Sequence, residues 1–312
     1  MGCLTVGGGK DLAVLVLHGI GTYSGQGRMK RKGFDQPLRA ALESRLGADF
    51  QRIAWCPITW SAPALERRQD ALIRERGTPF PWSGLFEFVS SFLSDATAHN
   101  LPLYGEMNES SSYFIVQQLI RGALVELEAQ LGPAAESMPV LAIAHSMGCH
   151  VLSCYAWDAR HAPERILGGN APELGPLTRF QALETLSGLV FVGCNLPLLT
   201  TNVARQRLLP LRLPRRPAAL GGGRESLWLN IWEKNDPLGY PLSNEYEAYF
   251  SGGFDAEELA RWKRDPASEQ RPQDIEVKFG GLAGATPLAH TAYYHSRRVQ
   301  KRITDVVKAL LG

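Results

Sequence analysis

One serine of the chain stands where a strand is expected to give way directly to a helix. Ser146 ends the apolar run PVLAIAHS (139–146) and precedes GCHVLSCYAWDAR (148–160), which has helical spacing. A serine hydroxyl is a weak nucleophile, and a sharp strand-to-helix turn can hold it beside an activating base. Such a turn leaves little room two residues before and after the serine, where the chain has Ala144 and Gly148. The pattern A-x-S-x-G therefore predicts a catalytic nucleophile and not only the N-cap of a helix.

This segment resembles the nucleophile turn of the α/β-hydrolase superfamily. The resemblance rests on the order strand, A-H-S-M-G, helix, about 130 residues after a strand that ends in H-G-I-G, and it covers essentially the whole chain. Within the superfamily the chain is similar to serine hydrolases of the lipase and esterase type, in which a histidine precedes the nucleophile as His145 does here. The resemblance implies a mostly parallel sheet flanked by helices and a triad in the chain order Ser, Asp, His.

Catalysis of this kind also needs N–H donors aimed at the negative oxygen of the tetrahedral intermediate. In this fold the first donor belongs to the residue after the nucleophile, here Met147. The second comes from the loop after the first strand, where L-H-G-I-G-T resembles the oxyanion segment of lipases and indicates Ile20, with Gly21 as the alternative. His18 in the same segment is expected to hold the loop and not to act as the base.

The acid of the triad is expected after a later strand. Asp236 ends the apolar run LWLNIWEKND and is followed by P-L-G, a turn that would leave its carboxylate at the carboxyl edge of the sheet. Glu233 is the nearest alternative, but it comes earlier, where the strand is still expected to be buried. We expect Asp236 to be the acid.

The base is expected between the last strand and the final helix. The segment GGLAGATPLAHTAYYHSRRV contains two histidines, His290 and His295. His290 lies in an irregular stretch just ahead of Thr291, a possible helix cap, whereas His295 would already lie in the helix and point along its surface. We expect His290 to be the base.

A parallel sheet would bring these residues to one edge. Apolar runs bounded by turn residues predict strands at 11–21, 50–60, 139–146, 189–195, 226–236 and 274–280, and helical spacing predicts helices at 34–46, 112–131, 148–160 and 293–311. Strands that alternate with helices are typical of βαβ units and of the α/β class. We expect one α/β-hydrolase domain over residues 1–312.

Two segments interrupt this alternation. Residues 78–111 predict a helical insertion after the second strand, and their first part, TPFPWSGLFEFVSSFL (78–93), carries five aromatic side chains (Phe80, Trp82, Phe86, Phe88 and Phe92). The insertion is expected either to cap the site, giving an acyl group an apolar wall, or to pack as a core helix against the sheet. Residues 205–223 are rich in arginine, proline and glycine, which predicts an irregular, solvated basic loop.

Composition excludes several classes of protein. With 312 residues, 45% of them hydrophobic, the chain can bury a large core, and 33 basic against 31 acidic residues leave a formal charge of +2. No strongly basic face is evident, so we expect no nucleic-acid partner. The five cysteines lie mostly in apolar segments and form no C-x-x-C pair, which predicts reduced core thiols and no zinc site.

The N-terminal segment and the glycine loop after the first strand argue against a membrane segment and a dinucleotide site. The first apolar stretch follows no basic segment and is too short for a signal or a membrane span, so we expect a cytoplasmic protein with no integral membrane segment. The glycines of GIGTYSG lack the acidic residue that a dinucleotide site needs near the end of the next strand, at 54–62. No phosphate-binding loop or metal-ligand spacing occurs, so no cofactor and no metal are expected.

Together these residues predict a serine hydrolase that cleaves a carboxylic ester of a small molecule through an acyl-enzyme. Two alternatives stay open. The same triad could serve an amidase or peptidase, because it does not select the leaving group, or the fold could bind a ligand without catalysis. The sequence does not decide the oligomeric state.

Overall fold

The computed structural model of the chain describes a discontinuous set of segments: residues 9–19, 23–24, 27–28, 33–60, 111–168, 175–201, 203–211, 213, 227–257, 270–280 and 287–312. Of the insertion expected at 78–111, all but Ser111 lies outside these residues. Its role as a cap or a flanking helix therefore stays a prediction.

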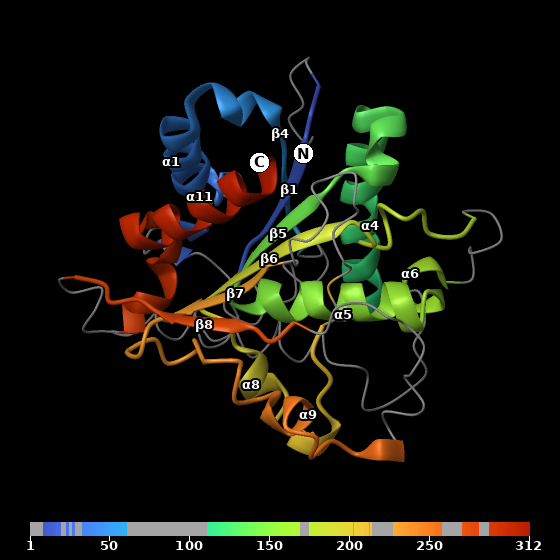
Figure 1. Ribbon diagram of the computed structural model, residues 1–312, viewed down its shortest axis with the longest axis vertical. Coiled ribbons are helices and arrows are strands. Elements are labelled where there is room, and N and C mark those ends of the chain that lie inside the picture. The colour runs from blue at the N-terminus through green and yellow to red at the C-terminus, as the bar shows by residue number, and fades with distance from the viewer. Residues whose placement is uncertain are drawn as a thin grey trace.

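A parallel sheet forms the centre of the described structure (Figure 1). Its six strands lie in the order β4-β1-β5-β6-β7-β8, and every neighbouring pair is parallel. The strands are β1 (Leu12–Leu17), β4 (Ile53–Ile58), β5 (Val140–His145), β6 (Leu186–Val192), β7 (Leu227–Trp232) and β8 (Gln273–Glu276). A separate antiparallel pair follows β1, formed by β2 (Tyr23–Ser24) and β3 (Gly27–Arg28).

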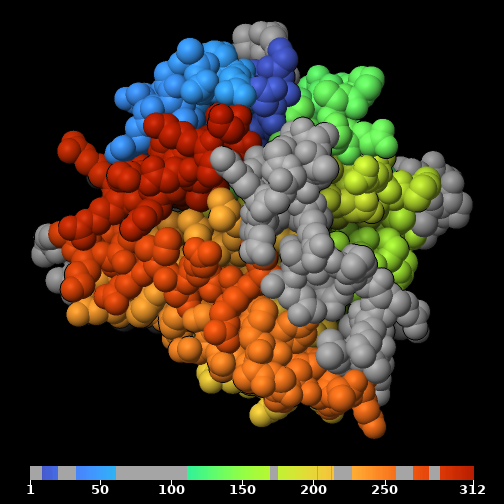
Figure 2. Space-filling view, in the orientation of Figure 1, coloured from blue at the N-terminus to red at the C-terminus, as the bar shows by residue number. Residues whose placement is uncertain are grey.

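Helices cover both faces of the sheet, as a parallel sheet requires. On one face lie α4 (Ser112–Leu131) and α5 (Met147–His161), and on the other lie α1 (Gln36–Leu46) and α11 (Arg297–Leu311). Figure 2 shows the surfaces of α1 and α11 adjoining each other, in blue and red. The parallel sheet with helices on both faces confirms the predicted α/β class and is consistent with the predicted α/β-hydrolase fold.

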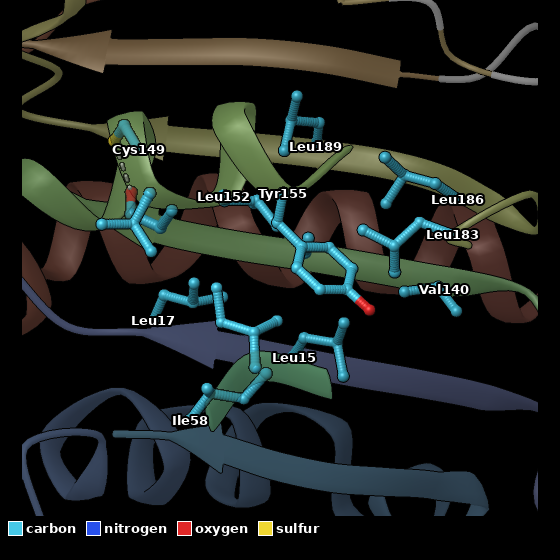
Figure 3. Close-up of a cluster of buried hydrophobic side chains, with 14 of the residues drawn as sticks. Leu15, Leu17, Ile58, Val140, Cys149, Leu152, Tyr155, Leu183, Leu186 and Leu189 are labelled. Atoms are coloured by element: carbon cyan, nitrogen blue, oxygen red, sulfur yellow. Dashed lines mark hydrogen bonds between the residues drawn. The ribbon is translucent and has the colours of Figure 1, made fainter. Parts of the chain in front are cut away.

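Each face has its own hydrophobic core, and successive residues of β1 alternate between the two. Leu15 packs on the side of α4 and α5, together with Leu152 and Tyr155 of α5 (Figure 3). Val14 packs on the opposite side, in the cluster that includes Ile303 of α11. Because both faces are covered, β1 is apolar at every position, and this is the continuous apolar run that the sequence shows.

Short helical turns connect the larger elements. They are η1 (Gly47–Arg52), η2 (Gly132–Ser137), α6 (Glu164–Leu167), α8 (Leu196–Leu199), η4 (Arg205–Arg207), α9 (Glu247–Phe250), η7 (Pro287–Thr291) and η8 (Tyr293–His295). Among the described helices, none is both long and apolar enough to cross a membrane.

The last helix begins later than the sequence predicts. The apolar spacing from 293 onward predicted one continuous helix, but α11 starts at Arg297, and the residues before it form η7 and η8. Ser296 interrupts the helix because its backbone is extended, with φ −74° and ψ 119°. Thr291 is therefore not the cap of the final helix; it lies in η7.

Two other expectations need correction. Within the segment 205–223, Arg205 is exposed and pairs with Glu245, but Leu211 and Leu213 are buried in the core on the α5 side, so the described part is not simply a solvated loop. The cysteines also differ from the expectation of five reduced thiols. Cys56 is disulfide-bonded, whereas Cys149, Cys154 and Cys194 are free.

Replacing Leu15 with alanine should lower the free energy of unfolding by about 2–5 kcal/mol, because the change leaves a cavity in a fully buried strand. Val125 on α4 gives a control, since it is 40% exposed and Val125→Ala should change stability by less than about 0.5 kcal/mol. Urea unfolding followed by circular dichroism measures both values. Equal losses in the two variants would contradict the central position of β1.

Candidate active site

A single residue, Ser146, separates β5 from α5. β5 ends at His145 and α5 begins at Met147, and the serine between them has φ 54° and ψ −124°, a region that residues other than glycine rarely adopt. Its N–H donates to the carbonyl of Val192 on β6 at 3.1 Å, and its carbonyl accepts from the N–H of Cys149 at 2.9 Å. The neighbouring strand and the first turn of the helix therefore hold the serine in this conformation.

Two glycines give the turn at Ser146 the room it needs. A Cβ on Gly148 would lie 2.5 Å from the carbonyl oxygen of His18, just after β1, and a Cβ on Gly19 would lie 2.6 Å from the Cβ of Ser146. Real side chains do not approach so closely. The expected crowding after the serine is therefore present at Gly148, and Gly19 is a second tight contact that the sequence analysis did not identify.

Ser146, His290 and Asp236 form a chain of hydrogen bonds. Ser146 Oγ lies 2.6 Å from His290 Nε2, and His290 Nδ1 lies 2.9 Å from both carboxylate oxygens of Asp236. An ionised carboxylate can only accept, so Nδ1 carries the ring proton of a neutral imidazole and Nε2 accepts from the serine hydroxyl. All three residues are buried. The structure thus brings together three side chains that are 54 to 144 residues apart in the sequence.

Asp236 lies in a tight turn after β7 that supplies further donors. Its Oδ1 accepts from the N–H of Leu238 at 2.9 Å, and its Oδ2 accepts from the hydroxyl of Tyr293 at 2.8 Å. Burial by itself would raise the pKa of Asp236, but the hydrogen bond and charge of His290, together with these two donors, lower it overall. The carboxylate is therefore ionised at neutral pH although it is almost completely buried.

His145 supports the loop that carries His290. Its Nε2 lies 2.8 Å from the backbone carbonyl of His290, which can only accept, so His145 donates from this nitrogen. The two imidazole rings are 4.9 Å apart. Burial lowers the pKa of His145 to about 3, so this ring is neutral over the ordinary pH range.

The expected oxyanion donors are only partly described. Met147 is buried and is the first residue of α5, and its sulfur lies 3.9 Å from Nδ2 of Asn195. Ile20 and the alternative Gly21 lie outside the described residues. Gly19, immediately before them, packs against Ser146, so the chain enters this loop beside the serine.

His18 makes contacts that agree with a structural role at the end of β1. Its ring stacks on Trp60 with centroids 5.2 Å apart and an interplanar angle of 12°, and its carbonyl accepts from Nε1 of Trp60 at 2.7 Å. The ring Nδ1 lies 2.5 Å from the carbonyl oxygen of Gly19. His18 thus contacts the residue that follows it and Trp60, which lies just after β4.

The alternative acid and base lie elsewhere. The carboxylate of Glu233 is buried and accepts from the N–H of Asn235 at 2.6 Å. His295 is exposed and lines a separate surface cavity of about 380 Å³ beside Lys278 and Arg298. Among the described residues, no group of three or more His, Cys, Asp or Glu side chains is placed to hold a metal ion.

Tyr293 and His145 lie beside His290, and the sequence predicted no contact with His290 for either residue. Tyr293 comes three residues after His290, a spacing that returns to the same side of a tight helical turn. That spacing is the one local signal that could have indicated it. The partners of the Tyr293 hydroxyl, by contrast, lie 57 and 60 residues away in the sequence.

Comparisons with known proteins identify no family for the chain. No protein-family model matches the sequence, and no curated protein matches it. Among solved structures, an acetyl xylan esterase in an iodinated complex matches with 12% identity over 97% of this chain and 99% of that one, at a TM-score of 0.36. A cutinase-like protein from Cryptococcus sp. matches with 9% identity over 97% of this chain and 95% of that one, also at a TM-score of 0.36. Likenesses this distant establish neither an activity nor a substrate.

Gly148→Ala should destabilise the protein by about 1–3 kcal/mol, because the new methyl group meets backbone and not a side chain that could move aside. Gly122→Ala is a matched control on α4, where a Cβ meets nothing within 4 Å, and it should stabilise the protein by about 0.5–1 kcal/mol. Denaturant unfolding gives both values. The packing described around Ser146 would be wrong if the two alanine variants shifted stability in the same direction.

Proposed function

We propose that the chain is a serine hydrolase that cleaves carboxylic esters of small molecules through an acyl-enzyme. Ser146 is the nucleophile, His290 the general base and acid, and Asp236 the residue that orients His290. The observation that carries the proposal is the 2.6 Å hydrogen bond between Ser146 Oγ and His290 Nε2, made by a serine with φ 54°. A serine that only capped a helix would need neither the unusual backbone nor the buried imidazole.

In the first half of the reaction, Ser146 Oγ attacks the ester carbonyl carbon while His290 Nε2 takes the hydroxyl proton. The carbonyl oxygen becomes negative in the tetrahedral intermediate. We assign its stabilisation to the backbone N–H groups of Met147 and Ile20, as the resemblance to lipases implies. When the intermediate collapses, the C–O bond to the alcohol breaks, and His290 returns the proton to the departing oxygen. The product alcohol leaves and the acyl group stays on Ser146.

The second half repeats these steps with water. His290 Nε2 takes a proton from a water molecule as its oxygen attacks the acyl carbon, and a second tetrahedral intermediate forms. Its collapse breaks the bond to Ser146 Oγ, which recovers a proton from His290. A carboxylic acid is released, and the enzyme returns to its starting state.

Asp236 contributes orientation and charge. Its bond to His290 Nδ1 selects the tautomer that leaves Nε2 free to accept, and its negative charge stabilises the imidazolium that forms in each step. Because the pKa of Asp236 is lowered, this charge is present at neutral pH. The carboxylate itself does not need to take up a proton.

A fluorophosphonate probe should label the folded protein at Ser146, because this serine has a base within hydrogen-bond distance. Mass spectrometry of the digested protein locates the adduct, and Ser146→Ala should abolish it. Ser153 on α5 is a suitable control, since its hydroxyl donates to the carbonyl of Cys149; Ser153→Ala should leave labelling unchanged. A protein that binds ligands without catalysis would give no adduct at Ser146.

Asp236→Asn and His290→Ala should each lower kcat for a nitrophenyl ester by about three to four orders of magnitude, through loss of the tautomer and of the base, respectively. His295→Ala should change kcat by less than about twofold, because this histidine is exposed and lines another cavity. Hydrolysis of matched esters and peptide amides by the unaltered protein completes the test. Faster cleavage of the amides would show that the protein is an amidase and not an esterase. A fall in kcat in His295→Ala but not in His290→Ala would show that His290 is not the base.

A further inference from the structure

The hydroxyl of Tyr293 lies between the acid of the site and the end of β7. It is 2.8 Å from Oδ2 of Asp236 and 3.1 Å from the backbone nitrogen of Glu233. The side chain is 1% exposed. A buried phenol with two partners at these distances satisfies both its donor and its acceptor within the protein.

The chemistry of the two partners fixes the direction of both bonds. The N–H of Glu233 can only donate, so it occupies a lone pair of the Tyr293 oxygen. The hydroxyl proton is then directed to Asp236, which accepts it as a carboxylate. Burial raises the pKa of Tyr293 well above its ordinary value, so the phenol is a neutral donor throughout the pH range of the enzyme.

The surroundings of Tyr293 are shaped to keep its ring in this position. A Cβ on Gly193 would lie 2.7 Å from the ring, and a Cβ on Gly239 would lie 2.5 Å from Oδ2 of Asp236 and 2.9 Å from the phenol oxygen. Phe279 packs edge-on against the ring with centroids 5.1 Å apart. Side chains at either glycine would therefore displace the pair formed by the phenol and the carboxylate.

We infer that Tyr293 is a positioning residue that fixes the Asp236 carboxylate against His290, an inference that rests on the proposed function of these two residues. Tyr293 and His290 lie three residues apart in the same segment, η7 to η8, and both reach the same carboxylate. The hydroxyl of Tyr293 also accepts a hydrogen bond from the backbone N–H of Glu233, where the turn that carries Asp236 begins. Three contacts thus join the loop of the base to the turn of the acid, and only the one between His290 and Asp236 belongs to the triad.

Tyr293→Phe keeps the ring but removes the donor to Asp236. Because hydrogen bonds to charged groups are among the stronger ones, kcat for a nitrophenyl ester should fall about 10- to 100-fold, with KM changed by less than about twofold. The acid limb of the profile of kcat/KM against pH should also move to higher pH. Without the phenol as a donor, the Asp236 carboxylate carries more of its negative charge, and this charge stabilises the protonated imidazole of His290. A higher pH is then needed to remove the proton from Nε2.

Tyr294→Phe is the matched control. Tyr294 is also buried, in the same turn, but its hydroxyl donates to the backbone carbonyl of Leu17 at 3.3 Å and not to the acid. We expect its pH profile to equal that of the unaltered protein. A similar fall in kcat in both variants, with no shift of either pH profile, would mean that Tyr293 only packs, and would overturn the inference.

A measurement that needs no catalysis separates this inference from the proposed function. The ¹³C signal of the Asp236 carboxyl group, assigned by its loss in Asp236→Asn, reports the titration of this residue. Tyr293→Phe should raise the pKa of Asp236 by at least about half a unit, because a donor to the charged form is lost. If the protein hydrolyses no ester but the pKa of Asp236 rises in this way, the proposed function is wrong, whereas the inference that Tyr293 positions the Asp236 carboxylate is supported. An unchanged titration would overturn the inference, whatever the activity.

A second substitution guards against poor folding of Tyr293→Phe. Replacing Tyr293 with 3-fluorotyrosine keeps the hydroxyl and makes it a stronger donor. The acid limb and the Asp236 titration should then move to lower pH, opposite to the phenylalanine variant. Movement of both variants in the same direction would contradict a role through this hydrogen bond.

Discussion

The reversed backbone at Ser146 is the constraint around which the described site is arranged. A backbone of this kind costs on the order of 1–3 kcal/mol and persists only where its surroundings impose it. Here the surroundings are the two strands beside β5. β6 supplies the carbonyl of Val192, and the end of β1 lies so close that only glycine fits at positions 19 and 148. The position of the serine hydroxyl is therefore set by the sheet, whose core is closely packed, and not by a loop.

Parallel strands also explain why distant segments meet at this serine. Every described strand of the sheet ends at the same edge, so the turn after β7 and the segment after β8 emerge beside the turn after β5. Asp236 comes from the first of these segments and His290 from the second. Both are nearly buried, and in such surroundings their hydrogen bonds and charges act more strongly than they would in water.

Local signals in the sequence were enough to predict the fold class and the segments in which the site residues lie. Small residues around Ser146, an apolar run that ends at Asp236 and the irregular stretch before the last helix are all properties of neighbouring residues, although the catalytic roles stay predictions. Tyr293 could not be found in this way, because a tyrosine beside a helix is typical of the core and its task depends on groups remote in sequence. The start of α11 at Arg297 was missed for a similar reason: the spacing of apolar residues continues through η8 although the backbone does not.

The neutral ring of His145 couples the architecture of the site to the stability of the whole protein in acid. Once the chain unfolds, this imidazole regains an ordinary pKa near 6.5, whereas in the folded protein burial lowers its pKa to about 3. At a pH between these two pKa values, His145 is protonated in the unfolded chain and neutral in the folded protein. The contribution of His145 to stability is therefore complete above pH 6.5 and declines as the pH falls toward 3. His145, which supports the loop of His290, is thus also a residue whose protonation in acid favours the unfolded state.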